Sequence, residues 1–249
     1  MPSKRQTRIS MKQTIFATLL GLTALGFSAC DDGRIPEKVV SFKEGRVVKL
    51  TGTLAGLENW PDEYNVAIAG FDGTDDYAII SKAISKDAGG AMSIVLSGIN
   101  DNVSHVQLCV LDRLRRHVMT FSEMELEQTR DTMYMEVGTV NVSMFNAIQQ
   151  SYFNTTCANC HGASNRAAAG LYLTEGQSYQ ALVGKPSTKI EGINMVEPGD
   201  AEGSLLHTIL HQEVVEGISM THRDLVSEKN EQSILPLIDS WINHGAKED

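Results

Sequence analysis

Apolar and polar residues alternate along the first half of the chain with a period of two. In the run from Arg46 to Leu54, the apolar residues Val48, Leu50 and Leu54 alternate with polar ones. This pattern is typical of a strand with one buried face. Similar runs follow at residues 64–71, 77–83, 92–96, 106–111, 117–121 and 133–140. Turn-forming residues separate these runs, and no helical pattern lies between them. We therefore predict an antiparallel β-sandwich of immunoglobulin or fibronectin type over residues 45–140.

After residue 140 the apolar positions follow a helical period instead. Asn141 or Ser143 can cap a helix whose apolar stripe of Phe145, Ile148 and Tyr152 ends just before Cys157. Further helices are expected after a capping box at 174–177, after the turn at 198–200, and over the apolar positions 234–242. The fold expected is thus a two-domain chain, an all-β sandwich at 45–140 and an all-α domain at 141–249.

The start of the last helix depends on which serine caps it. Capping by Ser233 places Pro236 in the first turn, where proline is tolerated. Capping by Ser227 places the same proline inside the helix, where we expect a kink.

The N-terminus has the pattern of a secretory signal. Four basic residues, with no acidic residue among them, precede an apolar run from Ile15 to Ala29. That run has about 15 residues, fewer than the roughly 20 that a membrane-spanning helix needs. Residues 1–29 are therefore predicted to be a cleaved signal peptide.

The end of this segment, Leu25 to Cys30, resembles a bacterial lipobox, in which the cysteine becomes a lipidated N-terminus. Phe27 departs from the usual aliphatic residue, and ordinary cleavage after Ser28 or one residue later is the alternative. Residues 30–44 lack periodicity and are expected to form a tether. The prediction is an exported bacterial lipoprotein on the periplasmic or cell-surface side of a membrane, anchored through Cys30.

The charge of the chain argues against nucleic acid as a partner. Without the four basic residues of the signal, 17 of the 21 basic residues remain against 31 acidic ones, a net charge of about −14. The excess of acidic residues is typical of a soluble surface, and it also favours a redox partner with a basic docking surface.

Residues 157–161 read Cys-Ala-Asn-Cys-His, the C-x-x-C-H signature of c-type haem attachment. Two thiols on one helical turn can add to the two vinyl groups of a single porphyrin. The next side chain, His161, then projects its imidazole towards the iron. We expect one covalent haem c held by Cys157, Cys160 and His161.

Two other uses of these cysteines are disfavoured. A zinc site combining them with His207 and His211 would need an interval far longer than that of a zinc finger. A thioredoxin-like redox pair would need a strand before the cysteines, where we predict a helix.

A haem that only carries electrons needs a second axial ligand, and a methionine sulfur raises its potential. Met195 and Met220 both lie in non-periodic stretches after the motif, unlike methionines on an apolar helical face. His222 and His207 are further alternatives. The remaining histidines are expected to have surface or capping roles.

Residues 150–247 resemble the class I cytochromes c, and more closely the planctomycete-type cytochrome c domains. The resemblance rests on Cys157 to Gly162, the sequences at 170–173, 197–200 and 204–206, Met220, Trp241-Ile242 and Gly245-Ala246. It implies that Met220 is the sixth iron ligand. Thr221 and His222 replace the prolines that usually follow this methionine in the family, and the resemblance says nothing about the strand region.

These patterns favour a monohaem electron carrier over an enzyme. Phe145, Tyr152, Leu205, Leu206 and Trp241 are expected to exclude water around the porphyrin. One alternative is a haem-based sensor or a peroxidase-like enzyme with an open sixth position. The other is a ligand-binding or glycan-binding lipoprotein in which the haem is accessory.

Overall fold

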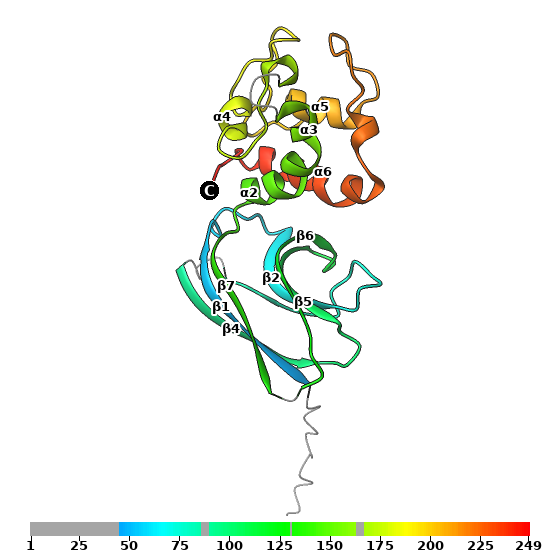
Figure 1. Cartoon of the computed structure of the whole chain (residues 1–249). Coiled ribbons are helices and arrows are strands. Elements are labelled where there is room, and N and C mark those ends of the chain that lie inside the picture. Colours follow the sequence, from blue (N-terminus) through cyan, green and yellow to red (C-terminus); the bar gives the residue numbers. More distant parts are fainter. Residues whose placement is uncertain (1–44, 86–89, 130, 163–166) are drawn as a thin grey trace, which may run out of the picture. The chain divides into compact units, whose positions relative to one another are not determined.

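The computed structural model describes residues 45–85, 90–129, 131–162 and 167–249 (Figure 1). The predicted signal peptide, the lipid-anchor Cys30 and the tether lie outside these residues. The chain from Glu44 to Asp249 forms one compact unit. In the part of the chain that is described, no helix is both long and apolar enough to span a bilayer.

The seven runs with alternating polarity all form strands. They are β1 (Arg46–Ala55), β2 (Tyr64–Phe71), β3 (Ile80–Ala83), β4 (Gly90–Ile99), β5 (His105–Asp112), β6 (His117–Glu125) and β7 (Thr132–Asn141). In β1 the inward residues Val48 and Leu50 are fully buried, while Lys49 and Thr51, which alternate with them, are partly exposed. The alternation therefore predicted both the strand and its buried face.

The strands form two sheets, ordered β4-β1-β7 and β3-β2-β5-β6. Most neighbours are antiparallel, as in the pairing of Val66 with Val110. The expectation of a wholly antiparallel sandwich is wrong, however, because β1 and β7 are parallel, with Leu50 opposite Met135. Alternation within each strand gives its buried face but not the direction of its neighbour.

The C-terminal segment, residues 142–249, contains mostly short helices. They are α2 (Met144–Ile148), the π-helix η1 (Gln149–Cys157), α3 (Ala158–His161), the 3₁₀ turn η2 (Ala168–Gly170), α4 (Ser178–Leu182), α5 (Leu205–His211), the 3₁₀ turn η3 (Arg223–Leu225) and α6 (Glu228–Asn243). Turns and isolated β-bridges, such as Val183 with Val196, connect them. The helix expected from the apolar stripe before Cys157 runs on through η1 and α3 to His161, so that both cysteines are helical.

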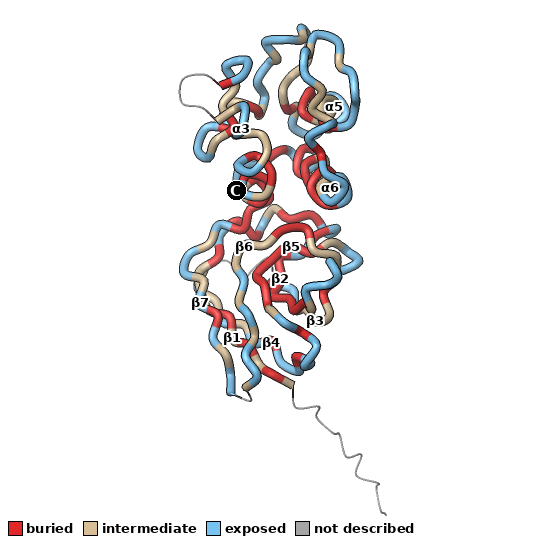
Figure 2. The backbone as a smooth tube through the Cα atoms, turned by 45° about the vertical axis from the view of Figure 1, so that its right-hand side comes forward, coloured by how far each residue is buried: buried red, intermediate tan, exposed pale blue. Residues whose placement is uncertain are grey.

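The predicted division into an all-β domain and an all-α domain is wrong. Strands make up 35% and helices 27% of the structure, and no all-α C-terminal domain is evident. The physical reason is that most buried apolar residues of both regions belong to one cluster. It includes Leu50 and Ile68 of the sheets together with Ile148 and Leu237 of the helices (Figure 2).

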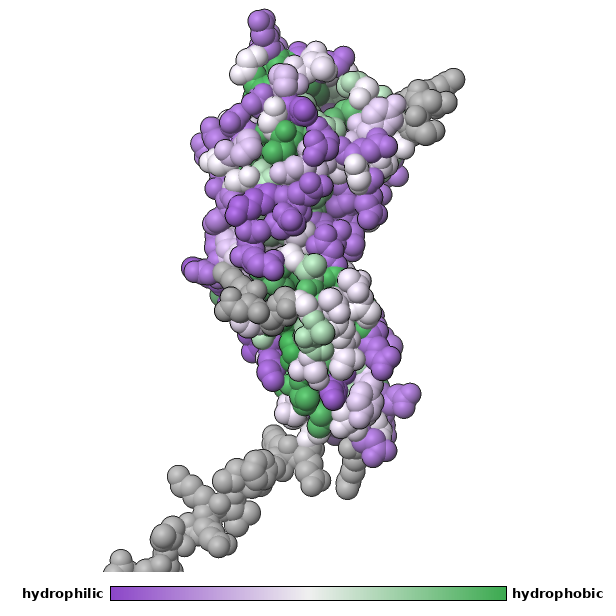
Figure 3. Space-filling model, turned by 90° about the vertical axis from the view of Figure 1, so that its left-hand side faces the viewer, coloured by the Kyte–Doolittle hydropathy of each residue, from purple (hydrophilic) through white to green (hydrophobic). Residues whose placement is uncertain are grey.

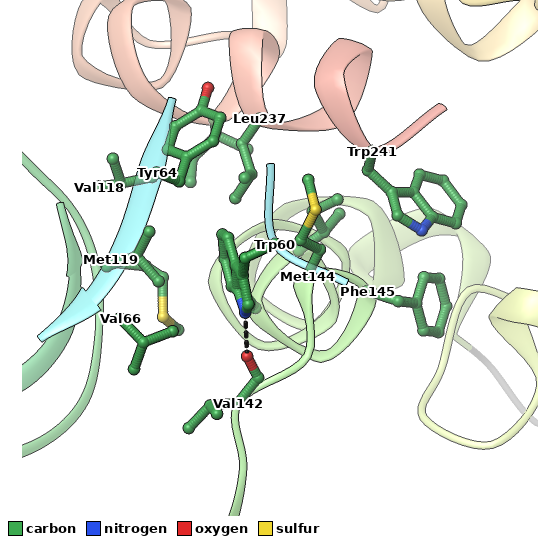
Figure 4. Packing of buried hydrophobic residues seen from close by; sticks show 14 of the residues in the cluster. Trp60, Tyr64, Val66, Val118, Met119, Val142, Met144, Phe145, Leu237 and Trp241 are labelled. Carbon is green, nitrogen blue, oxygen red and sulfur yellow. Dashed lines mark hydrogen bonds between the residues drawn. The ribbon is translucent and has the colours of Figure 1, made fainter. Parts of the chain in front are cut away.

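Trp60 lies where the two regions join. Only 4% of it is exposed, and its indole N–H donates a 2.7 Å hydrogen bond to the carbonyl of Val142 (Figure 4). Leu237 of α6 lies beside Tyr64 in the same cluster. Trp60 is thus a core residue and not an exposed platform for a ligand.

The C-terminus is tied to the same junction. The carbonyl of Glu248 accepts a 3.1 Å hydrogen bond from the Ser143 hydroxyl, and the Lys247 ammonium donates at 2.7 Å to the side-chain oxygen of Asn59. Asn59 also donates to the carbonyl of Asp249. The last residues therefore contact both the loop after β1 and the start of α2.

Helix caps explain where two of the helices begin. Ser143 caps α2 and Ser227 caps α6, each accepting a hydrogen bond from the backbone N–H three residues later. Of the two starts considered for α6, the structure has the earlier one, and Pro236 lies inside this helix. The expected capping box before α4 is wrong, because no side chain caps that helix.

Candidate haem-attachment site

The two cysteines of the motif lie on one continuous helical stretch. Cys157 ends η1, and Cys160 lies in α3. Cys157 is partly buried and packs against the core, whereas Cys160 is exposed, and neither forms a disulfide. The next residue after the motif is glycine because a Cβ at Gly162 would lie 2.3 Å from the Ala158 carbonyl oxygen.

A short loop orients His161. Its Nδ1 lies 3.1 Å from the carbonyl oxygen of Ala168, to which it can only donate. Its backbone carbonyl accepts a 2.8 Å hydrogen bond from the N–H of Leu173. Gly170 between these partners has a φ of 71°, a conformation that favours glycine. With the proton on Nδ1, the free nitrogen is Nε2, the atom that commonly binds a metal.

Gln149 connects the helical stretch to the chain that follows His161 through side-chain hydrogen bonds. Its buried side-chain amide donates to the carbonyl of Leu173 at 3.2 Å and to the side chain of Asn154 at 2.7 Å. Its oxygen accepts a hydrogen bond from the hydroxyl of Ser178. These bonds fix the chain on both sides of His161, so its imidazole is held by the surrounding backbone.

The segment after α5 brings a second imidazole to His161. The His222 ring centroid lies 6.3 Å from that of His161, with 20° between the ring planes. Its Nδ1 donates a 3.0 Å hydrogen bond to the carbonyl of Met220, which leaves Nε2 free here also. Burial, the largest cause, lowers the pKa of His222 and favours its neutral form, which is the form that binds metals.

The candidate sixth ligands differ in their surroundings. Met220 is 46% exposed and lies two residues before His222, in the segment next to His161. Met195 instead packs against the apolar core, and its backbone bonds to Lys185 and Leu206. Met220 and the alternative Met195 stay predictions.

The residues expected to exclude water are buried. Phe145 packs against Trp241 with the rings tilted by 36° and packs edge-on to Phe153 and Tyr179, at centroid distances of 5.2, 6.2 and 5.2 Å. Tyr152, Leu205 and Leu206 are also buried. On the face drawn in Figure 3, hydrophilic residues cover most of the C-terminal segment, with small hydrophobic patches between them.

The alternative uses of the cysteines gain no support. Burial raises the pKa of Cys157 to about 12, so its thiol stays protonated at neutral pH, unlike the thiolate of a redox-active pair. Among the described residues, the group of potential metal ligands that contains His207 and His211 is completed by Asp239 and includes no cysteine. The zinc site that would combine these histidines with the cysteines is therefore wrong.

Two features of this region were missed from the sequence. The approach of His222 to His161 depends on the path of a long loop, and no local pattern indicates it. The pairing of His207 and His211 with Asp239 had a partial signal in the i, i+4 spacing of the histidines, which places them on one face of a helix. No protein-family model, curated protein or solved structure matches this chain.

Proposed function

We propose that the chain is an exported monohaem cytochrome c that carries single electrons. The observation that carries this proposal is the orientation of His161. It follows two cysteines on one helical stretch, and its Nδ1 bonds to the Ala168 carbonyl, which leaves Nε2 for iron. Cys157 and Cys160 would hold the porphyrin covalently, and the iron would supply reversible one-electron chemistry.

The segment that contains Met220 is proposed to supply the sixth ligand. The resemblance to class I cytochromes favours Met220, and the 6.3 Å between the rings of His222 and His161 supports the placement of this segment beside the iron. His207 is less suitable because its Nδ1 is bonded to Asp239 at 2.8 Å. A ligand on each side of the iron would leave no coordination position for a substrate, which favours a carrier over an enzyme.

The proposed site of action is outside the cytoplasm, because covalent haem attachment takes place there and residues 1–29 have the pattern of a signal peptide. The lipid on Cys30 would hold the carrier at a membrane. The excess of acidic residues favours a redox partner with a basic surface.

The direct test is to express the full chain in a host with a c-type haem attachment system. We expect a pyridine haemochrome spectrum of haem c, one iron per chain, and an intact mass that includes haem and the lipidated Cys30. The Cys157→Ser/Cys160→Ser variant should carry no covalent haem. Colourless wild-type protein with two free thiols would overturn the proposal.

The axial ligands can be assigned by spectroscopy without a redox partner. Replacement of Met220 by Ala should remove the near-infrared charge-transfer band of a methionine-ligated ferric haem and lower the potential. Met195→Ala is the matched control and should change neither. Stoichiometric carbon monoxide binding to the ferrous wild type would instead indicate an open sixth position, and with it a sensor or a peroxidase-like enzyme.

A further inference from the structure

A second group of potential metal ligands lies outside the haem motif. His207 and His211 share one face of α5, and their rings stack at a centroid distance of 4.1 Å. Asp239 faces both from α6. Its two carboxylate oxygens lie 2.8 Å from Nδ1 of His207 and 3.1 Å from Nε2 of His211. One potential ligand atom from each of the three residues lies within 4.8 Å of the others.

These distances suit a small transition-metal ion. Ligand atoms bound at about 2.1 Å from a tetrahedral ion are roughly 3.4 Å apart, and about 3.0 Å apart at adjacent positions of an octahedral ion. The observed nitrogen-to-oxygen distances of 2.8 and 3.1 Å run to the two different oxygens of Asp239, and both lie close to the octahedral spacing. Two imidazoles with one carboxylate favour ions such as Zn²⁺, whereas Mg²⁺ and Ca²⁺ prefer ligand sets made of oxygen.

The ligands are accessible to an incoming ion. The exposed fractions of the His207, His211 and Asp239 side chains are 23%, 36% and 24%. A cavity of about 440 Å³, lined in part by His211, Asp239 and two further carboxylates of Glu63 and Glu231, opens beside them. These acidic groups favour the approach of a cation.

A purely structural role would be a carboxylate that accepts a hydrogen bond from each imidazole. That role also accounts for both nitrogen-to-oxygen distances, and zinc binding distinguishes it from a metal site. A bound ion would use all three side chains at once. It would also strengthen the connection between α5 and α6, which the two His–Asp contacts already make.

We propose that His207, His211 and Asp239 bind one divalent transition-metal ion of the class that prefers imidazole, with Zn²⁺ as its probe. The remaining coordination positions would face the cavity and take water. This site is separate from the proposed haem and does not depend on it, since neither cysteine nor His161 belongs to the cluster.

The test is a Zn²⁺ titration of the full-length protein against a competing chelator, with iron and zinc counted by elemental analysis. We expect one zinc per chain in addition to any iron, and a Tm that rises with Zn²⁺ but not with Mg²⁺. His211→Ala should weaken zinc binding at least about 100-fold. Loss of a side chain that only hydrogen-bonds to a metal ligand already costs roughly 10- to 100-fold, and His211 would bind the ion directly.

Two further variants keep the result interpretable if one protein folds poorly. Asp239→Asn preserves the side-chain shape and should also lose most of the affinity, with an unchanged circular dichroism spectrum. His244→Ala removes a histidine that lines the same cavity but lies outside the ligand group, and should alter the Kd less than about twofold. Unchanged zinc binding in His211→Ala, or loss of the zinc only in Cys157→Ser/Cys160→Ser, would overturn the proposal.

Discussion

The strand region and the C-terminal segment are stabilised in different ways. Residues 46–141 form ladders of backbone hydrogen bonds between strands of up to 10 residues. Apart from η1 and α6, the helices of the C-terminal segment have three to seven residues, and side chains form hydrogen bonds to several of its backbone carbonyls. Gln149 bonds to the carbonyl of Leu173, and Trp241 bonds to that of Lys247. Within the described residues, the candidate haem and metal ligands lie in this less regular region.

Strand ladders and side-chain-to-backbone hydrogen bonds differ in the arrangements of side chains that they can position. A ladder fixes a sheet but presents its side chains in a repeating order. An irregular segment can bring His222 to His161 from a distant part of the chain. It needs a rigid support, and here the support is the common core, in which Trp60 and Val142 connect the two regions.

The largest expected effect tests whether that core unites the two regions. Trp60→Ala removes a buried indole and its hydrogen bond, and should lower the free energy of unfolding by about 3–5 kcal/mol. Circular dichroism of the strands and fluorescence of the remaining Trp241 should report the same lowered midpoint in urea. Tyr134→Ala, at a residue that is 63% exposed on β7, is the control and should cost under about 0.5 kcal/mol. Two separate transitions would show that the regions unfold independently.

A smaller effect concerns pH and a histidine of the strand region. Mainly burial, and then the charge of Lys229 on α6, lowers the pKa of His117 from 6.5 to about 4. Its Nε2 bonds to Thr120 at 2.7 Å. Between these pKa values the unfolded chain binds a proton that the folded chain does not. His117 should therefore destabilise the fold by about 1–3 kcal/mol as the pH falls from about 6.5 to about 4, with no further change above 6.5.

Urea midpoints measured near pH 7 and near pH 4.5 test this expectation. Carboxyl groups also titrate in this range, so the comparison is between the wild type and His117→Gln. The variant should lose less stability on acidification. Equal losses in both proteins would contradict the assignment to His117.

The Ser227 cap at the start of α6 should contribute less to the free energy of unfolding than Trp60 does. Ser227→Ala removes the side chain that accepts a 3.2 Å hydrogen bond from the N–H of Asn230, and should cost about 1 kcal/mol. Ser233→Ala is the same change within the helix, where the hydroxyl only bonds back to the Lys229 carbonyl, and should cost under about 0.5 kcal/mol. Equal midpoint shifts in thermal unfolding would be evidence against the Ser227 cap.

The smallest effect is expected for an ion pair between the two regions. Lys229 and Asp76 lie 3.3 Å apart, but their side chains are 59% and 54% exposed. Lys229→Ala should change the unfolding free energy by about 0–0.5 kcal/mol, and added salt should remove that difference. A cost above about 1 kcal/mol would mean that this exposed pair contributes as much as the core contacts nearby.

Strands were predictable from the sequence because burial alternates within each one, as in β1. The parallel pairing of β1 with β7 was not, because it depends on residues far apart in the chain. The same reason explains the wrong division into two domains. Helical periodicity after residue 140 indicated apolar faces, but not that Leu237 and Ile148 would join the core of the sheets.

For the candidate site, the sequence indicated the motif but not its surroundings. The spacing of Cys157, Cys160 and His161 is local and was readable directly. The bond from His161 to Ala168 and the approach of His222 arise from loops, whose paths are set by single hydrogen bonds and glycine conformations. Asp239 lies on α6, so its pairing with the histidines of α5 required the packing of two helices.

The attachment of the last residues to Asn59 and Ser143 has a practical consequence for handling the protein. Removal of residues 247–249 would take away bonding partners of both regions without shortening any helix. The resulting loss should show first as faster hydrogen exchange at the amides around Ser143, with the strand ladders still protected. A fusion tag would therefore disturb this junction less if its linker left Lys247 and Glu248 free to make these bonds.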